Sequence, residues 1–308
     1  MRAYERLLNY VRVYTTSDPE SGTHPSAARE FDLAHQLVEE LKALGVEDAR
    51  VDEHCYVYGS LPATPGCEDK PALGLIAHMD TAPDASGENV NPILHENYDG
   101  GDAGSIEYEN FNAAAATVTI HGFSVHPGSA KDTMINASNV AMEFHGALPV
   151  MARPETTEGR QGFYHLCQMY GDVTTAKLGY ILRDHDAAKL QFKKDNMQDI
   201  ADYLNGKYGD GTVEVEIKDS YRNMLEKIKP HFHLIETARK AVRMAGLEPE
   251  EVPVRGGTDG ATLSWKGLPC PNLGTGGFNF HGVCECTTVE RMDRCTQIVL
   301  NIIGLYAE

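Results

Sequence analysis

Two amphipathic segments open the chain. Between residues 27 and 44, apolar side chains recur every three or four positions, which is the spacing of one face of a helix, and Gly45 is a residue type that commonly ends helices. Residues 3–14 carry a weaker pattern of the same kind. Two short strands are expected next, around residues 49–52 and 55–61. The start of the chain therefore predicts two helices followed by a pair of strands.

The most informative stretch is a short apolar run that ends in a histidine and an aspartate. Residues 72–77 follow Pro71 and are almost entirely apolar, which is typical of a strand buried on both faces. His78 and Asp80 come at its end, where α/β proteins usually gather their chemistry. A neutral imidazole is a good zinc ligand, and a nearby carboxylate can orient it. An isolated pair of this kind is more often structural, so its meaning depends on the rest of the chain.

The middle of the chain alternates strands and helices. The pattern predicts strands over residues 106–121, 162–169, 176–183 and 212–217, and helices over residues 134–145 and 187–204. The order βαββαβ is that of a ferredoxin-like α+β module. We expect this module to occupy residues 105–225, inserted into an outer α/β domain formed by residues 1–104 and 226–308.

The outer pattern resumes after the module. A helix fits residues 231–245, strands fit residues 252–254 and 269–273, and a last helix begins near Thr287. Thr287 and Glu290 have the spacing of a capping box, in which the glutamate accepts a bond from the threonine amide. The predicted fold is a discontinuous α/β domain that carries an inserted ferredoxin-like lid.

Composition narrows the range of partners. The chain has 308 residues and a formal net charge of −18, which argues against nucleic acid and against anionic membranes as partners. It contains no apolar run of the roughly 18 residues that a membrane span needs, and its first residues lack the apolar core of a signal peptide. Seven cysteines without a CxxC pair predict reduced thiols in the cytoplasm.

Three further places could carry chemistry. His126 lies in a turn before Pro and Gly, although a lone histidine there is more often simply solvated. Arg255 opens a glycine-rich turn that suits a carboxylate better than a phosphate, because the spacing and lysine of a phosphate loop are absent. His281 follows another turn, with Cys284 and Cys286 close to it. Small buried or surface thiols are the commoner interpretation of that cysteine pair, and a metal site is the alternative.

Taken together, these segments resemble the peptidase T family of di-zinc peptidases. The resemblance rests on six segments, in this order: His78 to Asp84, Glu109 to Ala114, Val125 to Gly128, Glu155 to Gly159, Arg255 to Ala261 and Asn279 to Gly282. It implies a zinc-peptidase-like α/β domain with an inserted lid. It also implies a tripeptide aminopeptidase, in which a metal-activated water attacks the first peptide bond, with short peptides as substrates and a homodimer formed through the lid.

The resemblance also implies roles for individual residues. His78 would be a ligand of one zinc ion and His281 of the other, with Asp80 supporting His78. His126 would reach toward the scissile carbonyl, in many relatives from the lid of a neighbouring subunit. Two further residues would contact the substrate: Asn136 and Arg255.

Part of the family's metal site is missing. The family needs a bridging aspartate and an adjacent pair of glutamates, one of which acts as general base, and residues 81–110 contain neither. The segment Asp99-Gly100-Gly101-Asp102 resembles both edges of the absent part, and roughly a hundred residues are lacking there, far more than loop variation explains. A natural deletion, an engineered deletion and an error in joining sequence all fit this junction. Asp99 is then either a zinc ligand or part of a loop.

The missing residues limit the activity that we expect. A zinc ion needs three or four ligands, and only His78, Asp99 and His281 remain, so we expect at most one zinc ion where the family has two. Without a general base, we expect the chain to be inactive or nearly so. The alternatives are a dipeptidase or deacylase of the same family, and a non-catalytic protein that dimerises or binds peptides through its lid.

Overall fold

The computed structural model describes residues 1–96 and 103–308, and the chain divides into two compact units. Unit 1 comprises residues 1–106, 236–250 and 273–308, and unit 2 comprises residues 107–235 and 251–272. The expected lid, residues 105–225, lies almost wholly in unit 2. That unit also takes in the ten residues after it and the later stretch of residues 251–272.

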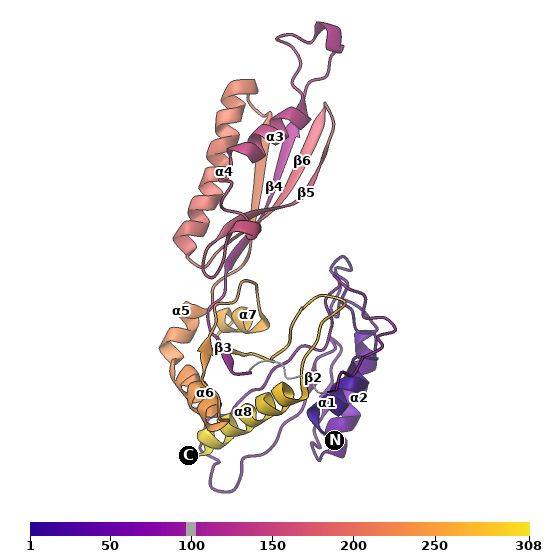
Figure 1. The fold of residues 1–308 in the computed structure, drawn as a ribbon, viewed down its shortest axis with the longest axis vertical. Coiled ribbons are helices and arrows are strands. Elements are labelled where there is room, and N and C mark those ends of the chain that lie inside the picture. Colours follow the sequence, from indigo (N-terminus) through magenta and orange to yellow (C-terminus); the bar gives the residue numbers. More distant parts are fainter. Residues whose placement is uncertain (97–102) are drawn as a thin grey trace. The chain divides into compact units, whose positions relative to one another are not determined.

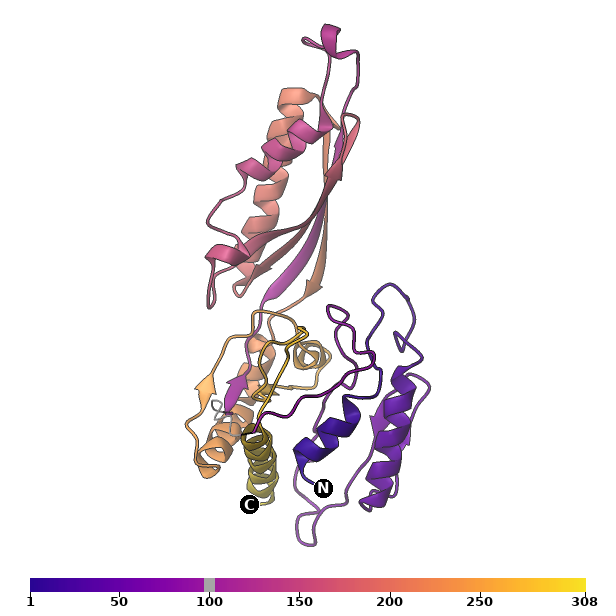
Figure 2. The ribbon, with the colours of Figure 1, turned by 45° about the vertical axis from the view of Figure 1, so that its right-hand side comes forward.

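Unit 2 contains the ferredoxin-like module, as predicted (Figure 1). Its elements follow the order β4 (Asn112–His121), α3 (Ala137–Ala147), β5 (Phe163–Gly171), β6 (Thr175–Asp184), α4 (Ala187–Tyr208) and β7 (Val213–Tyr221). The strands form one antiparallel sheet in the order β5-β6-β4-β7. Both helices cover the same face of this sheet (Figure 2). The shorter helices of the unit are η1 (Pro127–Ser129), η2 (Pro154–Thr156), α5 (Leu225–Ile228), η3 (Lys229–His231) and α7 (Asp259–Trp265).

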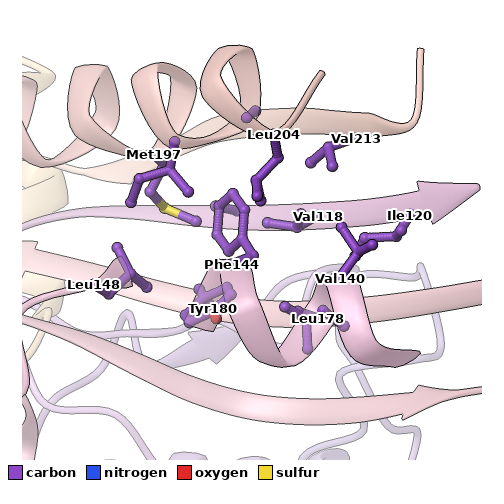
Figure 3. Packing of buried hydrophobic residues seen from close by; sticks show 14 of the residues in the cluster. Val118, Ile120, Val140, Phe144, Leu148, Leu178, Tyr180, Met197, Leu204 and Val213 are labelled. Atoms are coloured by element: carbon purple, nitrogen blue, oxygen red, sulfur yellow. The ribbon is translucent and has the colours of Figure 1, made fainter. Parts of the chain in front are cut away.

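The core of unit 2 lies between the sheet and its two helices (Figure 3). Alternate residues of β4 and β6 point toward the helices, including Val118, Ile120, Leu178 and Tyr180, and Phe144 of α3 packs among them. None of these side chains is more than 3% exposed. Because burial of a large apolar side chain contributes on the order of 1.5–3 kcal/mol, this layer is a main source of the unit's stability.

The strand expected over residues 106–121 is in fact two strands, so that prediction was wrong. β3 (Ser105–Glu107) ends before β4 begins at Asn112. In the link between them, Asn110 is fully buried, and its side chain bonds the backbone of Arg222 and Met224. Asn110 also forms a single parallel bridge with Val254. The apolar pattern of the sequence contains no sign of the break.

Unit 1 is built from helices and very short strands. Its helices are α1 (Ala3–Tyr10), α2 (Glu30–Ala43), most of α6 (His233–Met244) and α8 (Val289–Ala307), and it contains the antiparallel pair β1 (Arg50–Val51) and β2 (Val57–Tyr58). A three-stranded sheet has the order β8 (Glu250–Glu251), β3, β9 (Asn272–Leu273). Gly45 follows α2 with a φ of +93°, a left-handed conformation that suits glycine at a helix end, as predicted.

The apolar run at residues 72–78 does not form the strand that its pattern predicts. It has no regular secondary structure, and Leu75 and Ile76 are 58% and 52% exposed. A strand that is apolar throughout needs strands on both edges and cover on both faces. In the part of the chain that the structure describes, no strand pairs with this run. Thr81, just after it, is held by a parallel bridge to Thr16.

Two predictions near the C-terminus also need correction. Thr288, and not Thr287, accepts a bond from the Arg291 amide and caps α8. The strand expected over residues 252–254 reduces to a single bridge at Val254, which follows β8. In both cases the apolar pattern locates the element but not its ends, which depend on a capping bond for the helix and on a pairing partner for the strand.

No helix among the described residues is both long enough and apolar enough to span a membrane. The expected cytoplasmic location stays a prediction.

Candidate functional site

The first candidate pair lies directly after the apolar run of unit 1. The His78 Nδ1 lies 3.1 Å from the Asp80 carboxylate and 3.0 Å from the Asp80 carbonyl oxygen. Because both oxygens are acceptors, Nδ1 carries a proton, and in a neutral ring the lone pair would then be on Nε2, as in metal-binding histidines. The bond from His78 lowers the pKa of the Asp80 carboxyl, whereas burial acts in the opposite direction. The spacing of the two residues thus brings them into contact, and their role stays a prediction.

A second histidine–carboxylate pair lies in the same unit. The His281 Nδ1 is 3.3 Å from an Asp84 carboxylate oxygen. His281 has a φ of +63° and belongs to a turn that is closed by the antiparallel bridge between Phe278 and Cys286. The sequence does not identify Asp84 as the partner of His281, because the two residues are far apart in the chain. One feature of the sequence could have identified Asp84 as a site residue: it lies in the same short motif as His78.

The two pairs share one short segment of unit 1. Asp80 and Asp84 are separated by four positions, so their Cα atoms lie no more than about 14 Å apart. Each carboxylate contacts a different imidazole. The segment therefore links the two histidines that the sequence names as zinc ligands. Paired imidazoles and carboxylates of this kind can hold a metal ion or carry a proton.

The described residues do not complete a metal centre. No three histidine, cysteine, aspartate or glutamate side chains among them are grouped so that they could hold a metal ion. Asp99, the third expected ligand, lies outside the described residues. Cys284 and Cys286 are exposed thiols that form no such group with His281. Because a zinc ion needs three or four ligands, the described donors by themselves do not fit one.

Two of the predicted substrate-binding residues lie at one loop of unit 2. An antiparallel bridge between Phe123 and Ile135 closes the loop that contains His126, and Asn136 follows directly. The His126 Nδ1 accepts a bond of 3.1 Å from the Gly128 amide, so a neutral ring carries its proton on Nε2 and can donate it to a carbonyl oxygen. The Asn136 side-chain oxygen caps α3, which leaves its NH2 group as the part suited to donate to a ligand.

Arg255 is the third predicted substrate-binding residue, and its side chain is bonded to other residues of unit 2. Its guanidinium donates to three backbone carbonyl oxygens of residues 157–161 and to the Thr157 hydroxyl, at 2.8–3.3 Å. The rings of Phe111 and Phe163 have their centres 5.1 and 5.6 Å from its Cζ atom. Arg255 therefore stabilises a loop of unit 2, and its contact with a substrate stays a prediction.

A network of asparagines in unit 2, of which Asn110 and Asn112 are buried and Asn223 is half-buried, goes undetected in the sequence. The Asn223 amide donates to the Asn112 side chain at 2.9 Å, and the Asn223 side chain accepts from the Asn110 amide at 3.2 Å. The Asn110 side chain accepts from the Met224 amide at 2.8 Å. Trp265, the single tryptophan of the chain, donates its indole N–H to the Asn223 carbonyl at 3.1 Å. Asparagine is usually a surface residue, so only its burial reveals the network.

Comparison with known proteins sets these features in a family context. A family model for a peptidase dimerisation domain matches residues 108–212. Peptidase T of Alkaliphilus oremlandii is 39% identical over an alignment of 404 positions that covers 99% of this chain and 99% of that protein. Peptidase T of Clostridium perfringens strain 13 is 38% identical, with 100% and 99% covered. The first alignment exceeds the 308 residues of this chain by 96, so at least 96 positions of that relative have no counterpart here.

Two solved structures share the fold. A tripeptidase from Staphylococcus aureus Mu50 has a TM-score of 0.81 and 19% identity, with 99% of this chain and 98% of that chain covered. The aminopeptidase PepT from Bacillus cereus ATCC 10987 has a TM-score of 0.78 and 17% identity, with 100% and 98% covered. At these identities the likeness concerns the fold.

Proposed function

The chain belongs to the peptidase T family, and we propose that its site derives from a metal-dependent aminopeptidase that removes the N-terminal residue of tripeptides. One observation carries the proposal. His78 and His281, which are far apart in the chain, contact Asp80 and Asp84, which are separated by only four positions. Two imidazoles oriented by carboxylates are the kind of donor pair that metallopeptidases use.

In this proposal the carboxylates orient the imidazoles. Asp80 accepts a hydrogen bond from the Nδ1 of His78, and an Asp84 carboxylate oxygen lies 3.3 Å from the Nδ1 of His281. The Nε2 of each ring is then the nitrogen that would bind a metal ion. Loss of either carboxylate frees the ring to rotate or change tautomer, so each aspartate acts through its histidine.

In this proposal, residues of unit 2 bind and orient the peptide. The Nε2–H of His126 and the NH2 group of Asn136 are donors from one loop, suited to the carbonyl oxygens of a short peptide. Arg255 is positively charged and suits a peptide carboxylate. A carboxylate at Arg255 competes with the bonds that hold residues 157–161, so binding there would loosen that loop.

The chain is also impaired as a peptidase under this proposal. No bridging aspartate and no adjacent glutamate pair occurs at residues 81–110, and the alignment with a relative is 96 positions longer than the chain. Loss of a general base costs on the order of 10²–10⁴ in rate. The donors that remain support at most one zinc ion, with His78 and His281 among its ligands and Asp99 as the third.

A second candidate function is non-catalytic. The complete βαββαβ module and the match of residues 108–212 to a peptidase dimerisation domain favour a protein that dimerises or binds peptides through its lid. Within the enzyme class, a dipeptidase or deacylase of the same family is the nearest rival for the substrate. Sedimentation of the purified chain over a range of concentrations tests the dimer separately from any activity.

Metal content and hydrolysis test the main proposal together. We expect no more than one zinc ion per chain by elemental analysis. Hydrolysis should be slow, and it should be faster on tripeptides than on the rival substrates, which are dipeptides and acyl-amino acids. His78→Ala and His281→Ala should each remove the zinc, whereas His54→Ala, a change at an exposed histidine of the same unit, should leave it. Two tightly held zinc ions, or brisk tripeptide hydrolysis that a chelator abolishes, would contradict the impaired state. Zinc retained in both variants would contradict the site itself.

A further inference from the structure

His145 makes two contacts at the end of α3, and together they fix where its proton lies. The Nε2 atom of His145 is 3.2 Å from the Arg153 guanidinium, and its Nδ1 atom is 3.1 Å from the Tyr180 hydroxyl. A guanidinium has donors but no acceptor, so Nε2 accepts from Arg153 and Nδ1 carries the proton. The ring of His145 is therefore neutral in this arrangement, and a proton on Nε2 would place two donors against each other.

The backbone of Arg153 continues this chain of contacts. Its carbonyl oxygen accepts from the Thr157 hydroxyl at 2.9 Å. The same hydroxyl accepts from the Nη2 group of Arg255 at 3.0 Å, and the Thr157 carbonyl accepts from that group at 3.3 Å. The Nη1 group of Arg255 bonds two later carbonyls of the same loop. One half of the guanidinium is thus linked to His145 through Thr157 and Arg153.

The elements packed around α3 decide which charges His145 meets. Burial raises the pKa of the Tyr180 hydroxyl, which therefore stays protonated near neutral pH. On α4, Lys207 pairs with Glu143 at 2.6 Å, and the face that β4 turns toward the helices is apolar. Burial and, after it, the charge of Arg153 lower the pKa of His145. The ring therefore stays neutral down to below about pH 6.5, the ordinary histidine value, and its protonation then repels Arg153.

We propose that Arg153 and Thr157 are positioning residues for Arg255, and that the protonation state of His145 controls them. While His145 is neutral, its bond to Arg153 keeps the Thr157 hydroxyl against Nη2 of Arg255. When Nε2 of His145 takes a proton from solvent, Arg153 leaves, residues 153–157 loosen, and Nη2 becomes available to a peptide carboxylate. The inference rests on the proposed function, because that proposal assigns the peptide carboxylate to Arg255.

Hydrogen exchange tests the linkage in the complete chain without any ligand. Exchange is expressed as protection factors, which remove the intrinsic effect of pH. We expect the backbone amides of residues 153–161 to lose about fivefold in protection between about pH 7.5 and about pH 5, as for the loss of one hydrogen bond. His145→Gln keeps an acceptor for Arg153 that takes no proton in this range, so protection in this variant should be independent of pH.

Two controls lie in the same unit. His121→Gln makes the same chemical change at an exposed histidine of β4 and should leave the pH dependence of residues 153–161 unaltered. The amides of Thr174 and Thr175 bond the Asp172 carboxylate. Bonds from the Thr174 hydroxyl and from these amides lower the pKa of Asp172, so it stays ionised over this range and the protection of both amides should not change.

Peptide binding tests what the release of Nη2 does. The probes are trialanine and trialanine amide, which differ only at the C-terminal carboxylate. By calorimetry, the acid should gain about tenfold in affinity relative to the amide between about pH 7.5 and about pH 5, as for one hydrogen bond to a charged group. Thr157→Val removes the hydroxyl that bonds Arg255, so its preference for the acid should be equally strong at both pH values.

The outcomes separate this inference from the proposed function. Protection of residues 153–161 that is independent of pH, or that falls equally in His145→Gln, would overturn the linkage. A preference for trialanine that is the same at both pH values in the unaltered chain would overturn the release of Arg255. A pH-dependent loop with no preference for the acid at any pH would leave the linkage standing and count against the proposed function alone, because the peptide carboxylate would not bind at Arg255.

Discussion

Units 1 and 2 contain similar apolar patterns with opposite outcomes. In unit 2, Val118 and Leu178 are directly opposite each other on neighbouring strands and are fully buried. In unit 1, Leu75 and Ile76 belong to an equally apolar run and are more than half exposed. The contrast teaches that an apolar pattern records which neighbours a segment needs, and not whether those neighbours are present.

Contiguity along the chain explains the contrast. The sheet and helices of the module all come from residues 112–221, so each strand has its neighbours within one uninterrupted stretch, even where β4 pairs with β7. Unit 1 is assembled from three separated stretches, so an apolar segment there needs partners from distant parts of the chain.

The largest test of this comparison is to remove unit 1 altogether. The buried cluster of the module runs from Ala116 to Val213, wholly inside residues 105–225. We therefore expect that segment, expressed alone, to give the circular dichroism of a mixed α/β fold and a cooperative thermal transition. The segment loses Arg255 and with it the bonds to residues 157–161, so that loop should be cleaved first by proteases. An unfolded spectrum would show that the module depends on the rest of the chain.

Two matched side-chain substitutions, one in each unit, compare the two apolar patterns directly. Phe144→Ala removes a fully buried ring from the core of unit 2 and should lower the free energy of unfolding by about 3–5 kcal/mol. Ile76→Ala removes a half-exposed side chain in unit 1 and should change it by no more than about 0.5 kcal/mol. Chemical denaturation of both variants measures the difference. Comparable losses in the two variants would mean that the run at residues 72–78 is buried after all.

The asparagine network allows a finer test within unit 2. Asn110→Ala leaves the Met224 amide and the Arg222 carbonyl without their side-chain partner, which should cost about 1–3 kcal/mol. Asn110→Asp keeps the acceptor for Met224 but turns a buried carboxylate oxygen toward the Arg222 carbonyl, so it should lose at least as much stability at neutral pH. Because Trp265 is the single tryptophan and donates to this network, its fluorescence reports the transition without a label. A loss well below about 1 kcal/mol in Asn110→Ala would show that the bonds of this side chain contribute little.

The smallest expected effect is a pH dependence of unit 2. Burial, together with the charge of Arg153, holds the pKa of His145 below its usual value, and the ring contacts the Arg153 guanidinium at 3.2 Å and the Tyr180 hydroxyl at 3.1 Å. An unfolded chain protonates this histidine near pH 6.5. Below that pH the unfolded state binds more protons than the folded state, so stability falls as the pH decreases and is constant above the window.

His145→Gln provides the measurement. The variant should be less stable than the natural chain at about pH 8, and the difference should shrink as the pH is lowered through about 6.5. His185 contributes pH dependence of the same sign, because burial lowers its pKa also, so some pH dependence remains in the variant. Thermal unfolding between those pH values is sufficient. A difference that grows at low pH would mean that protonated His145 stabilises the fold.

The contacts of the candidate site, like those of the fold, are of two kinds: some join neighbours in the chain and others join distant residues. The contact between His78 and Asp80 follows from their spacing, because residues two positions apart lie within reach of each other in almost any backbone. The contact between His281 and Asp84 joins distant parts of the chain and has no signature in local pattern. Asp99 lies outside the described residues, so its place in the site stays a prediction.

The sequence by itself determined the elements whose partners belong to the same uninterrupted stretch of chain. Alternating and helical apolar spacing predicted the βαββαβ module, because each element there packs against a neighbour within one contiguous stretch. It also predicted the end of α2 at Gly45, since a left-handed residue after a helix is a local requirement.

Only the tertiary structure decided the features that depend on distant partners. In the structure the long predicted strand stops before β4, where Asn110 bonds the backbone of Arg222 and Met224, and residues 72–78 have no regular secondary structure. The structure also shows that the Arg255 guanidinium donates hydrogen bonds to the loop of residues 157–161. The physical reason is the same in each case. A backbone group or an apolar face is satisfied by whichever partner the whole fold brings within reach, and spacing along one segment contains no information about that partner.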